Sequence, residues 1–150
     1  MELVPIEQDG SVRVAAEDRS GSLASVSEMT LALYARRGFE LPWVCYLAVE
    51  HGVWVGTCGF AGPPASGEAE IAYFTFPGEE GRGVASHMAA QLLALTRARA
   101  VSLRLAYIAH TLAQESASTS ILRRLGFTLL GAIVHPEDGT VWKWRKSEVV

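Results

Sequence analysis

The sequence predicts a mixed α/β fold in a single domain over residues 1–150. A chain of 150 residues can bury a full core, and its 49% hydrophobic and 19% charged residues are typical of a globular protein. Runs rich in β-formers and runs with helical spacing follow each other in the order β-α-β-β-β-α-β-α-β-β. One strand-helix-strand unit over 70–108 requires two parallel neighbouring strands, so the sheet is expected to be mixed.

The first part of the chain is predicted to form a strand, a helix and a hairpin. A weak alternation at 11–16 predicts the first strand. Apolar residues at helical spacing predict a helix over 22–37, which ends at Gly38 because glycine favours a helix terminus. Two β-rich runs, 43–50 and 53–60, flank a His-Gly pair and predict a hairpin.

The middle of the chain carries the strand-helix-strand unit. The stretch "AGPPASG" at 61–67 is expected to be a loop, because two prolines and small residues cannot continue a strand. The run "EAEIAYFTFP" predicts a strand from 68 that Pro77 stops. An apolar helix follows over 84–97, and "VSLRLAYIA" at 101–109 alternates as the parallel strand.

A short helix and a second hairpin are predicted at the end of the chain. The helix spans 116–124 and is closed by Gly126, which can adopt the left-handed conformation of a helix cap. The runs at 127–134 and 140–146 flank "PEDG" and predict a hairpin. Because tryptophans alternate with basic residues in "WKWRK", we interpret the last run as a half-buried edge strand.

Charge and hydropathy exclude several classes of partner. The net charge is −3, and basic residues are scattered except for "KWRK" at 143–146, whereas a nucleic-acid-binding protein usually shows a broad basic face. No apolar run reaches the ~20 residues of a membrane span, and the acidic start "MELVPIEQDG" is unlike a signal peptide. We therefore expect a cytoplasmic protein that binds a small molecule or a protein segment, either as a monomer or as a homodimer.

The two cysteines are not expected to carry the chemistry. Cys45 and Cys58 lie on predicted strands, where buried, reduced thiols are the usual case. The sequence lacks the CxxC or HxxxH spacing of a metal site, so no metal is expected.

The turn "EEGRG" lies between the predicted central strand and the apolar helix. Glycines let a ligand approach the backbone, and a helix N-terminus has unpaired N–H groups that favour an anion. The turn is neither a P-loop nor a dinucleotide-binding motif, because the Gly-Lys-Ser/Thr end and the third glycine are absent. The residues alone fit two interpretations, a plain turn or a phosphate-binding site, which we call the phosphate seat. The seat would use the N–H groups of Gly81, Arg82, Gly83, Val84 and Ala85 and the positive charge of Arg82.

Two motifs resemble those of the GNAT N-acetyltransferase superfamily. "EEGRGVASHMAAQLL" is similar to its pyrophosphate-binding motif, Arg/Gln-x-x-Gly-x-Gly/Ala, with Gly83 and Ala85 in register and Glu80 in place of Arg or Gln. The stretch "AHTLAQESASTSILRRLGF" at 109–127 resembles the branch that includes ribosomal-protein N-terminal acetyltransferases. The resemblance covers about residues 40 to 146 and includes the order of the elements.

The resemblance implies acetyl-CoA as co-substrate. Its diphosphate would lie on the backbone amides of 81–85. In the family the central strand and the next parallel strand splay apart, and the thioester lies in that opening. Ser116 stands where the family usually has an asparagine that contacts the cofactor. The pantetheine arm is expected to pair with the exposed backbone of Phe74, Thr75 and Phe76.

Four residues are candidates for acid–base chemistry. Glu70 opens the central strand at the position where many family members carry glutamate, and it is the first candidate for the base; Glu68 is the alternative. His110 follows the parallel strand and is either a second base or a packing residue. The family's usual tyrosine acid is replaced by Leu122, while Ser118 matches a family serine that can relay a proton.

The resemblance thus implies an N-acetyltransferase that moves an acetyl group from acetyl-CoA to a primary amine of a small molecule or a protein N-terminus. The acceptor is expected to contact 20–42 and 61–67. Tyr73 on the central strand is interpreted as core or cleft wall rather than as the missing acid. Because Glu80, Ser116 and Leu122 depart from the family pattern, a non-catalytic acyl-CoA-binding domain remains the alternative.

Overall fold

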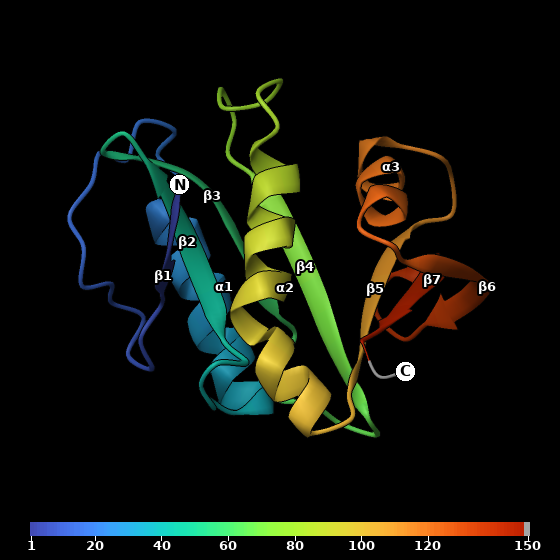
Figure 1. The fold of residues 1–150 in the computed structure, drawn as a ribbon. Helices are drawn as coiled ribbons and strands as arrows, with labels where there is room; N and C mark the ends of the chain where they lie inside the picture. The colour runs from blue at the N-terminus through green and yellow to red at the C-terminus, as the bar shows by residue number, and fades with distance from the viewer. Residues whose placement is uncertain (149–150) are drawn as a thin grey trace.

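A seven-stranded mixed sheet forms the centre of the protein (Figure 1). The computed structural model describes residues 1–148. The sheet order is β1-β2-β3-β4-β5-β7-β6, and every neighbouring pair is antiparallel except β4 and β5. The predicted class and element order are confirmed. The elements are β1 Glu2–Pro5, α1 Leu23–Arg37, β2 Cys45–Glu50, β3 Val53–Phe60, β4 Glu68–Thr75, α2 Val84–Ser102, β5 Ala106–Leu112, α3 Ala117–Arg124, β6 Thr128–His135 and β7 Gly139–Ser147.

The helices α1 and α2 cover opposite faces of the sheet (Figure 1). Helix α2 packs closely against β3 at Gly56, which lies under Met88 of the helix. A Cβ built on Gly56 would lie only 2.8 Å from the side chain of Met88. Helix α1 is held on the other face by Tyr34, whose hydroxyl donates to the carbonyl of Ile6 at 2.8 Å and accepts from the amide of Cys45 at 3.0 Å. The two faces of β4 therefore meet different surroundings.

The first strand lies earlier than the sequence predicted. The free edge of β2 is occupied by β1, with Val4 opposite Leu47. The expected strand at 11–16 is wrong: that segment is a loop, although Val12 and Val14 still pack against the core beneath α1. Its alternation reflects side chains that are partly buried by packing, without backbone pairing in the sheet.

The boundary between α2 and β5 also differs from the prediction. The strand expected at 101–109 begins only at Ala106, because Val101 and Ser102 complete the last turn of α2. Arg104 then takes a positive φ of 55° and turns the chain back towards the sheet. A short alternating pattern fits a helix end and a strand start equally well, so periodicity alone could not place this boundary.

Strand β7 is interior to the sheet, so the interpretation of it as an edge strand is wrong. It pairs with β5 on one side and β6 on the other, which makes β6 the edge. Trp144 is fully buried, and its Nε1–H donates to Oγ1 of Thr111 at 3.0 Å. Long-range pairing with β5, which the local sequence does not encode, decides this position.

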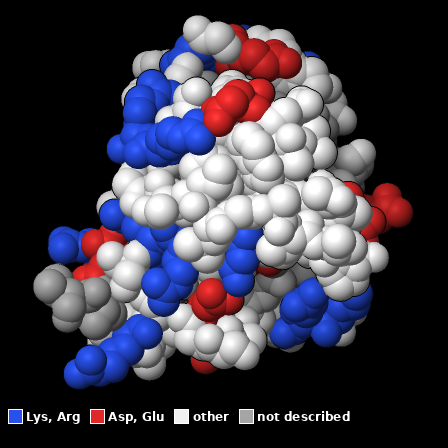
Figure 2. Space-filling view, turned by 90° about the vertical axis from the view of Figure 1, so that its right-hand side faces the viewer, with Lys and Arg blue, Asp and Glu red and all other residues white. Residues whose placement is uncertain are grey.

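No broad basic surface covers the side of the protein where α3, β6 and β7 lie. Figure 2 shows lysines and arginines there in separate groups, interspersed with acidic groups, around a wide uncharged area. Over residues 1–148, no helix is both long enough and apolar enough to cross a membrane.

Candidate active site

An opening forms where β4 and β5 diverge. The parallel ladder between them consists of Glu68 to Glu70 opposite Ala106 to Ile108. Farther along, β4 stays paired with β3 up to Thr75, while β5 stays paired with β7 (Figure 1). Beyond Glu70 no ladder joins β4 to β5, so the β4 backbone groups that point towards β5 have no strand partner and suit a ligand that can pair with them. This is the splay that the family resemblance implied.

The start of α2 lies at the wide end of this opening and offers a seat for an anion. Its N-cap is Gly83, with φ 75°, and no side chain caps the helix. A Cβ added to Gly81 or Gly83 would meet no protein atom within 4 Å, so the space above the turn is clear. Unpaired N–H groups at a helix start bind phosphate well. These features fit the diphosphate of acetyl-CoA.

A buried carboxylate anchors the turn. The side chain of Glu79 is only 3% exposed and is bound by the guanidinium groups of Arg19 at 2.6 Å and Arg82 at 2.8 Å. Hydrogen bonds from Arg19 outweigh the effect of burial and hold the pKa of Glu79 below its usual range. Arg82 also binds Glu50 at 2.9 Å. The guanidinium of Arg82 therefore forms ion pairs with two carboxylates. The group of Arg82 that can bind a phosphate most directly is its backbone N–H.

Glu80 points away from this network. Its side chain is exposed, and its Oε1 accepts a hydrogen bond from the amide of Gly78 at 2.6 Å. Sequence reasoning could not tell which of the two adjacent glutamates is buried, because both precede the same glycine.

Replacing Glu80 with glutamine should tighten CoA binding a few-fold. Glutamine keeps an oxygen that can accept from Gly78 and removes a negative charge near the proposed diphosphate seat. Exposed charges contribute about 1 kcal/mol or less, and the gain should shrink as salt screens it. Calorimetric titration of CoA at low and high ionic strength measures both effects. An unchanged Kd in both conditions would contradict the repulsion.

The structure brings Glu70 and His110 together. Nδ1 of His110 lies 3.0 Å from Oε2 of Glu70, with side-chain exposures of 12% and 32%. The ring of His135 packs edge-on against His110, with centroids 5.3 Å apart. This arrangement fixes the imidazole and holds the carboxylate at the narrow end of the opening. The other candidate base, Glu68, is ion-paired with Lys143 at 3.3 Å.

The predicted serines lie at the start of α3. Ser116 is the N-cap: its Oγ accepts from the amide of Thr119 at 3.3 Å, and its own amide donates to the Thr119 hydroxyl at 2.9 Å. The Ser116 side chain is thus used for capping. Ser118 is half-buried on the first turn, and its carbonyl oxygen contacts β4 across the opening.

Tyr73 makes this contact, which sequence reasoning missed. Its hydroxyl donates to the carbonyl oxygen of Ser118 at 3.1 Å, and burial raises the pKa of Tyr73 to about 12. Because side chains alternate along a strand, Tyr73 lies on the opposite face of β4 from Glu70. Leu122, at the family's tyrosine position, is fully buried. The alternation of side chains along β4 was the one signal in the sequence for this contact. Using it requires knowing which helix covers each face of the sheet.

Both cysteines are free thiols, but only Cys58 is buried as expected, whereas Cys45 is partly buried. Burial raises the pKa of Cys45 to about 11 and that of Cys58 to about 12, so both remain protonated at neutral pH. A protonated thiol is a poor nucleophile. Among residues 1–148, no group of three or more His, Cys, Asp or Glu side chains is placed to hold a metal ion.

Comparison with known families decides the classification. Residues 8–128 match the family model described as an acetyltransferase (GNAT) domain. The chain belongs to the GNAT acetyltransferase family. The resemblance seen in the sequence is therefore confirmed. Among curated proteins, none matches this GNAT protein.

Solved structures share the GNAT fold at low sequence identity. The ribosomal-protein-alanine N-acetyltransferase of Brucella melitensis is 24% identical, with TM-score 0.62, over 83% of this chain and 78% of its own. A putative GNAT-family acetyltransferase of Bordetella pertussis is 16% identical, with TM-score 0.64, over 96% and 93%. A putative acetyltransferase of Salmonella typhimurium, solved with acetyl-CoA, is 20% identical, with TM-score 0.61, over 81% and 73%.

Proposed function

We propose that this GNAT protein transfers an acetyl group from acetyl-CoA to a primary amine. The observation that carries the proposal is the opening between β4 and β5, which runs from the uncapped start of α2 to the Glu70–His110 pair. An anion seat at one end and an acid–base pair at the other suit a long phosphorylated thioester and its reaction with an amine. The acceptor is a small molecule or a protein N-terminus.

Each face of β4 carries one of the two proton transfers of the reaction. Acetyl-CoA, when bound, supplies the acetyl group as a thioester. On the α1 face, Glu70 accepts the proton that the amine loses as its nitrogen bonds to the acetyl carbon, and His110 keeps the carboxylate in position. On the other face, the Tyr73 hydroxyl turns from the Ser118 carbonyl oxygen and donates its proton to the sulfur as the C–S bond breaks. Its raised pKa of about 12 keeps the phenol protonated at neutral pH.

Cofactor binding and amine-dependent thiol release test this function separately. Calorimetry with acetyl-CoA reports binding, and the release of free CoA thiol in the presence of a panel of primary amines reports transfer. We expect binding together with thiol release that depends on an amine. Binding without thiol release from any amine would support the non-catalytic acyl-CoA-binding domain instead, and no binding would overturn both functions.

Replacing Tyr73 with phenylalanine should lower kcat by about tenfold or more. A general acid contributes roughly 10²-fold at the lower end of its range, and water replaces part of that contribution in the variant. The KM for acetyl-CoA should change little, because only a hydroxyl is lost. Since the pKa of Tyr73 is raised, the phenol stays protonated well above neutrality, so the loss should be equal at pH 7 and pH 9. Steady-state kinetics at both values measures it.

A matched control is Tyr46→Phe. Its hydroxyl donates to the carbonyl oxygen of Pro42 at 2.6 Å, far along the sheet on β2. This variant also loses a partly buried phenol–carbonyl hydrogen bond, so it should lower stability by about 1 kcal/mol and leave kcat unchanged. Equal kcat in Tyr73→Phe and wild type would remove Tyr73 from the mechanism.

A further inference from the structure

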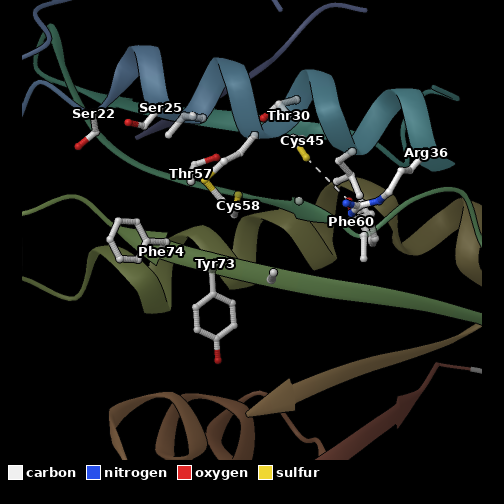
Figure 3. A pocket seen from close by; sticks show the side chains of 16 residues that line it. Ser22, Ser25, Thr30, Arg36, Cys45, Thr57, Cys58, Phe60, Tyr73 and Phe74 are labelled. Carbon is white, nitrogen blue, oxygen red and sulfur yellow. Dashed lines mark hydrogen bonds between the residues drawn. The ribbon is translucent and has the colours of Figure 1, made fainter. Parts of the chain in front are cut away.

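A largely apolar cavity of about 510 Å³ lies between α1 and the strands β3 and β4 (Figure 3). This volume is in the range of small-molecule sites. Val26, Met29 and Leu33 of α1 line one side, and Ala72 and Phe74 of β4 line the other. The side chain of an acceptor can therefore be buried against carbon on both sides.

The cavity lies on the same face of β4 as Glu70. Ala72 follows Glu70 by two residues, so both side chains lie on the same face of β4. At the same end, the amide of Ala61, which lines the cavity, donates to the carbonyl oxygen of Glu70 at 2.9 Å. The cavity therefore lies on the face where Glu70 would take a proton from the amine. Tyr73 also contributes to the cavity lining, but its ring is directed to the other face of β4, towards α3, where the thioester is proposed to lie (Figure 3).

The charge of the lining selects among amines. Arg36 is the one charged residue among those that line the cavity, and its side chain extends from the last turn of α1 towards Phe60 (Figure 3). Phe60 directly precedes Ala61, so the guanidinium lies at the Glu70 end. In the part of the chain that the structure describes, Arg36 forms no ion pair.

The lining offers no carboxylate for a second ammonium, because its polar side chains other than Arg36 are neutral hydroxyls and thiols. The Thr57 hydroxyl already donates to the carbonyl of Tyr46 at 2.8 Å, and Cys45 is a protonated thiol. No acidic residue lines the cavity. Because a buried charge without a partner is costly, a polyamine should be rejected. A carboxylate, in contrast, meets a guanidinium that can bind it through two hydrogen bonds.

The geometry points to an acceptor that is an apolar α-amino acid, or a compound with the same arrangement of amine and carboxylate. Its carboxylate binds Arg36, its amine lies beside Glu70, and its apolar side chain fills the cavity towards Met29 and Phe74. Amine and carboxylate sit on one carbon in such a compound, which matches the placement of Arg36 and Glu70 at the same end. This inference rests on the proposed acetyl transfer and adds the class of acceptor to it.

A comparison of five acceptors tests the class directly. We expect kcat/KM for L-phenylalanine or L-leucine to exceed that for phenethylamine, phenylalanine amide and spermidine by about tenfold, the effect of one hydrogen-bonded charge pair. A preference for phenylalanine amide would indicate a peptide N-terminus, and a preference for spermidine would indicate a polyamine. Either preference overturns the inference. If no amine releases thiol although acetyl-CoA binds, the proposed function itself fails.

Arg36→Gln supplies a test at the level of the residue, with Arg37→Gln as its control. Arg37 is the next residue of α1, carries the same charge and does not line the cavity. Arg36→Gln should weaken the use of L-phenylalanine about tenfold and leave phenethylamine unchanged, whereas Arg37→Gln should alter neither. Calorimetric binding of L-phenylalanine to CoA-loaded Glu70→Gln protein, with and without Arg36→Gln, gives a readout that needs no turnover. Equal affinities in that pair would overturn the role of Arg36.

Discussion

Replacing Glu70 with glutamine should lower kcat/KM by about 10²–10⁴-fold, the range that a positioned general base contributes. Glutamine keeps the shape of the side chain and can still accept a hydrogen bond from His110, so the local geometry is retained. What it loses is the ability to take a proton from the attacking amine. The acidic limb of the pH–rate profile should flatten in the variant, and binding of acetyl-CoA should be unchanged.

Glu68→Gln is the matched control for this substitution. Glu68 lies two residues earlier on the same face of β4, but it is ion-paired with Lys143. It should therefore keep activity within a few-fold of wild type. Full activity in Glu70→Gln at every pH, together with a loss in Glu68→Gln, would transfer the role of base to Glu68. Full activity in both variants would leave proton transfer to His110 or to water.

Replacing Gly83 with valine should abolish the stabilisation of the fold by CoA. A side chain at this position enters the clear space above the start of α2, where the diphosphate is proposed to lie. For the wild type, ligand at a hundredfold excess over Kd should add about 2.7 kcal/mol of stability, which corresponds to roughly 5–10 °C in Tm. Thermal melts with and without CoA measure the difference.

The strain of valine at a positive φ needs a control of its own, and Gly139 supplies it. Gly139 has φ 74°, against 75° for Gly83, and a Cβ there also meets nothing within 4 Å. Gly139→Val, at the first residue of β7, should therefore lose a similar ~1–3 kcal/mol but keep the full CoA-dependent rise in Tm. An equal rise in Gly83→Val would exclude this turn as the phosphate seat.

The sequence predicted the local elements and the cofactor turn because both depend on short patterns. The helical spacing of α1, the central hairpin and the loop at 61–67 follow from residues close together in the chain. The glycines of "EEGRG" have positive φ, as a tight turn before a helix requires. Errors arose where distant pairing overrode a local pattern, as at 11–16 and in β7.

The sequence by itself determined the mixed α/β class, the order of the elements, the GNAT motifs and the identity of Glu70, His110 and the glycine turn as candidates. Only the tertiary structure decided that Glu70 meets His110, that Glu79 rather than Glu80 is buried, and that Tyr73 reaches α3. It also created the cavity under α1. The physical reason is that these contacts join residues 40, 60 or 45 positions apart. Which face each side chain takes depends on how the helices cover the sheet, and no local pattern carries that information.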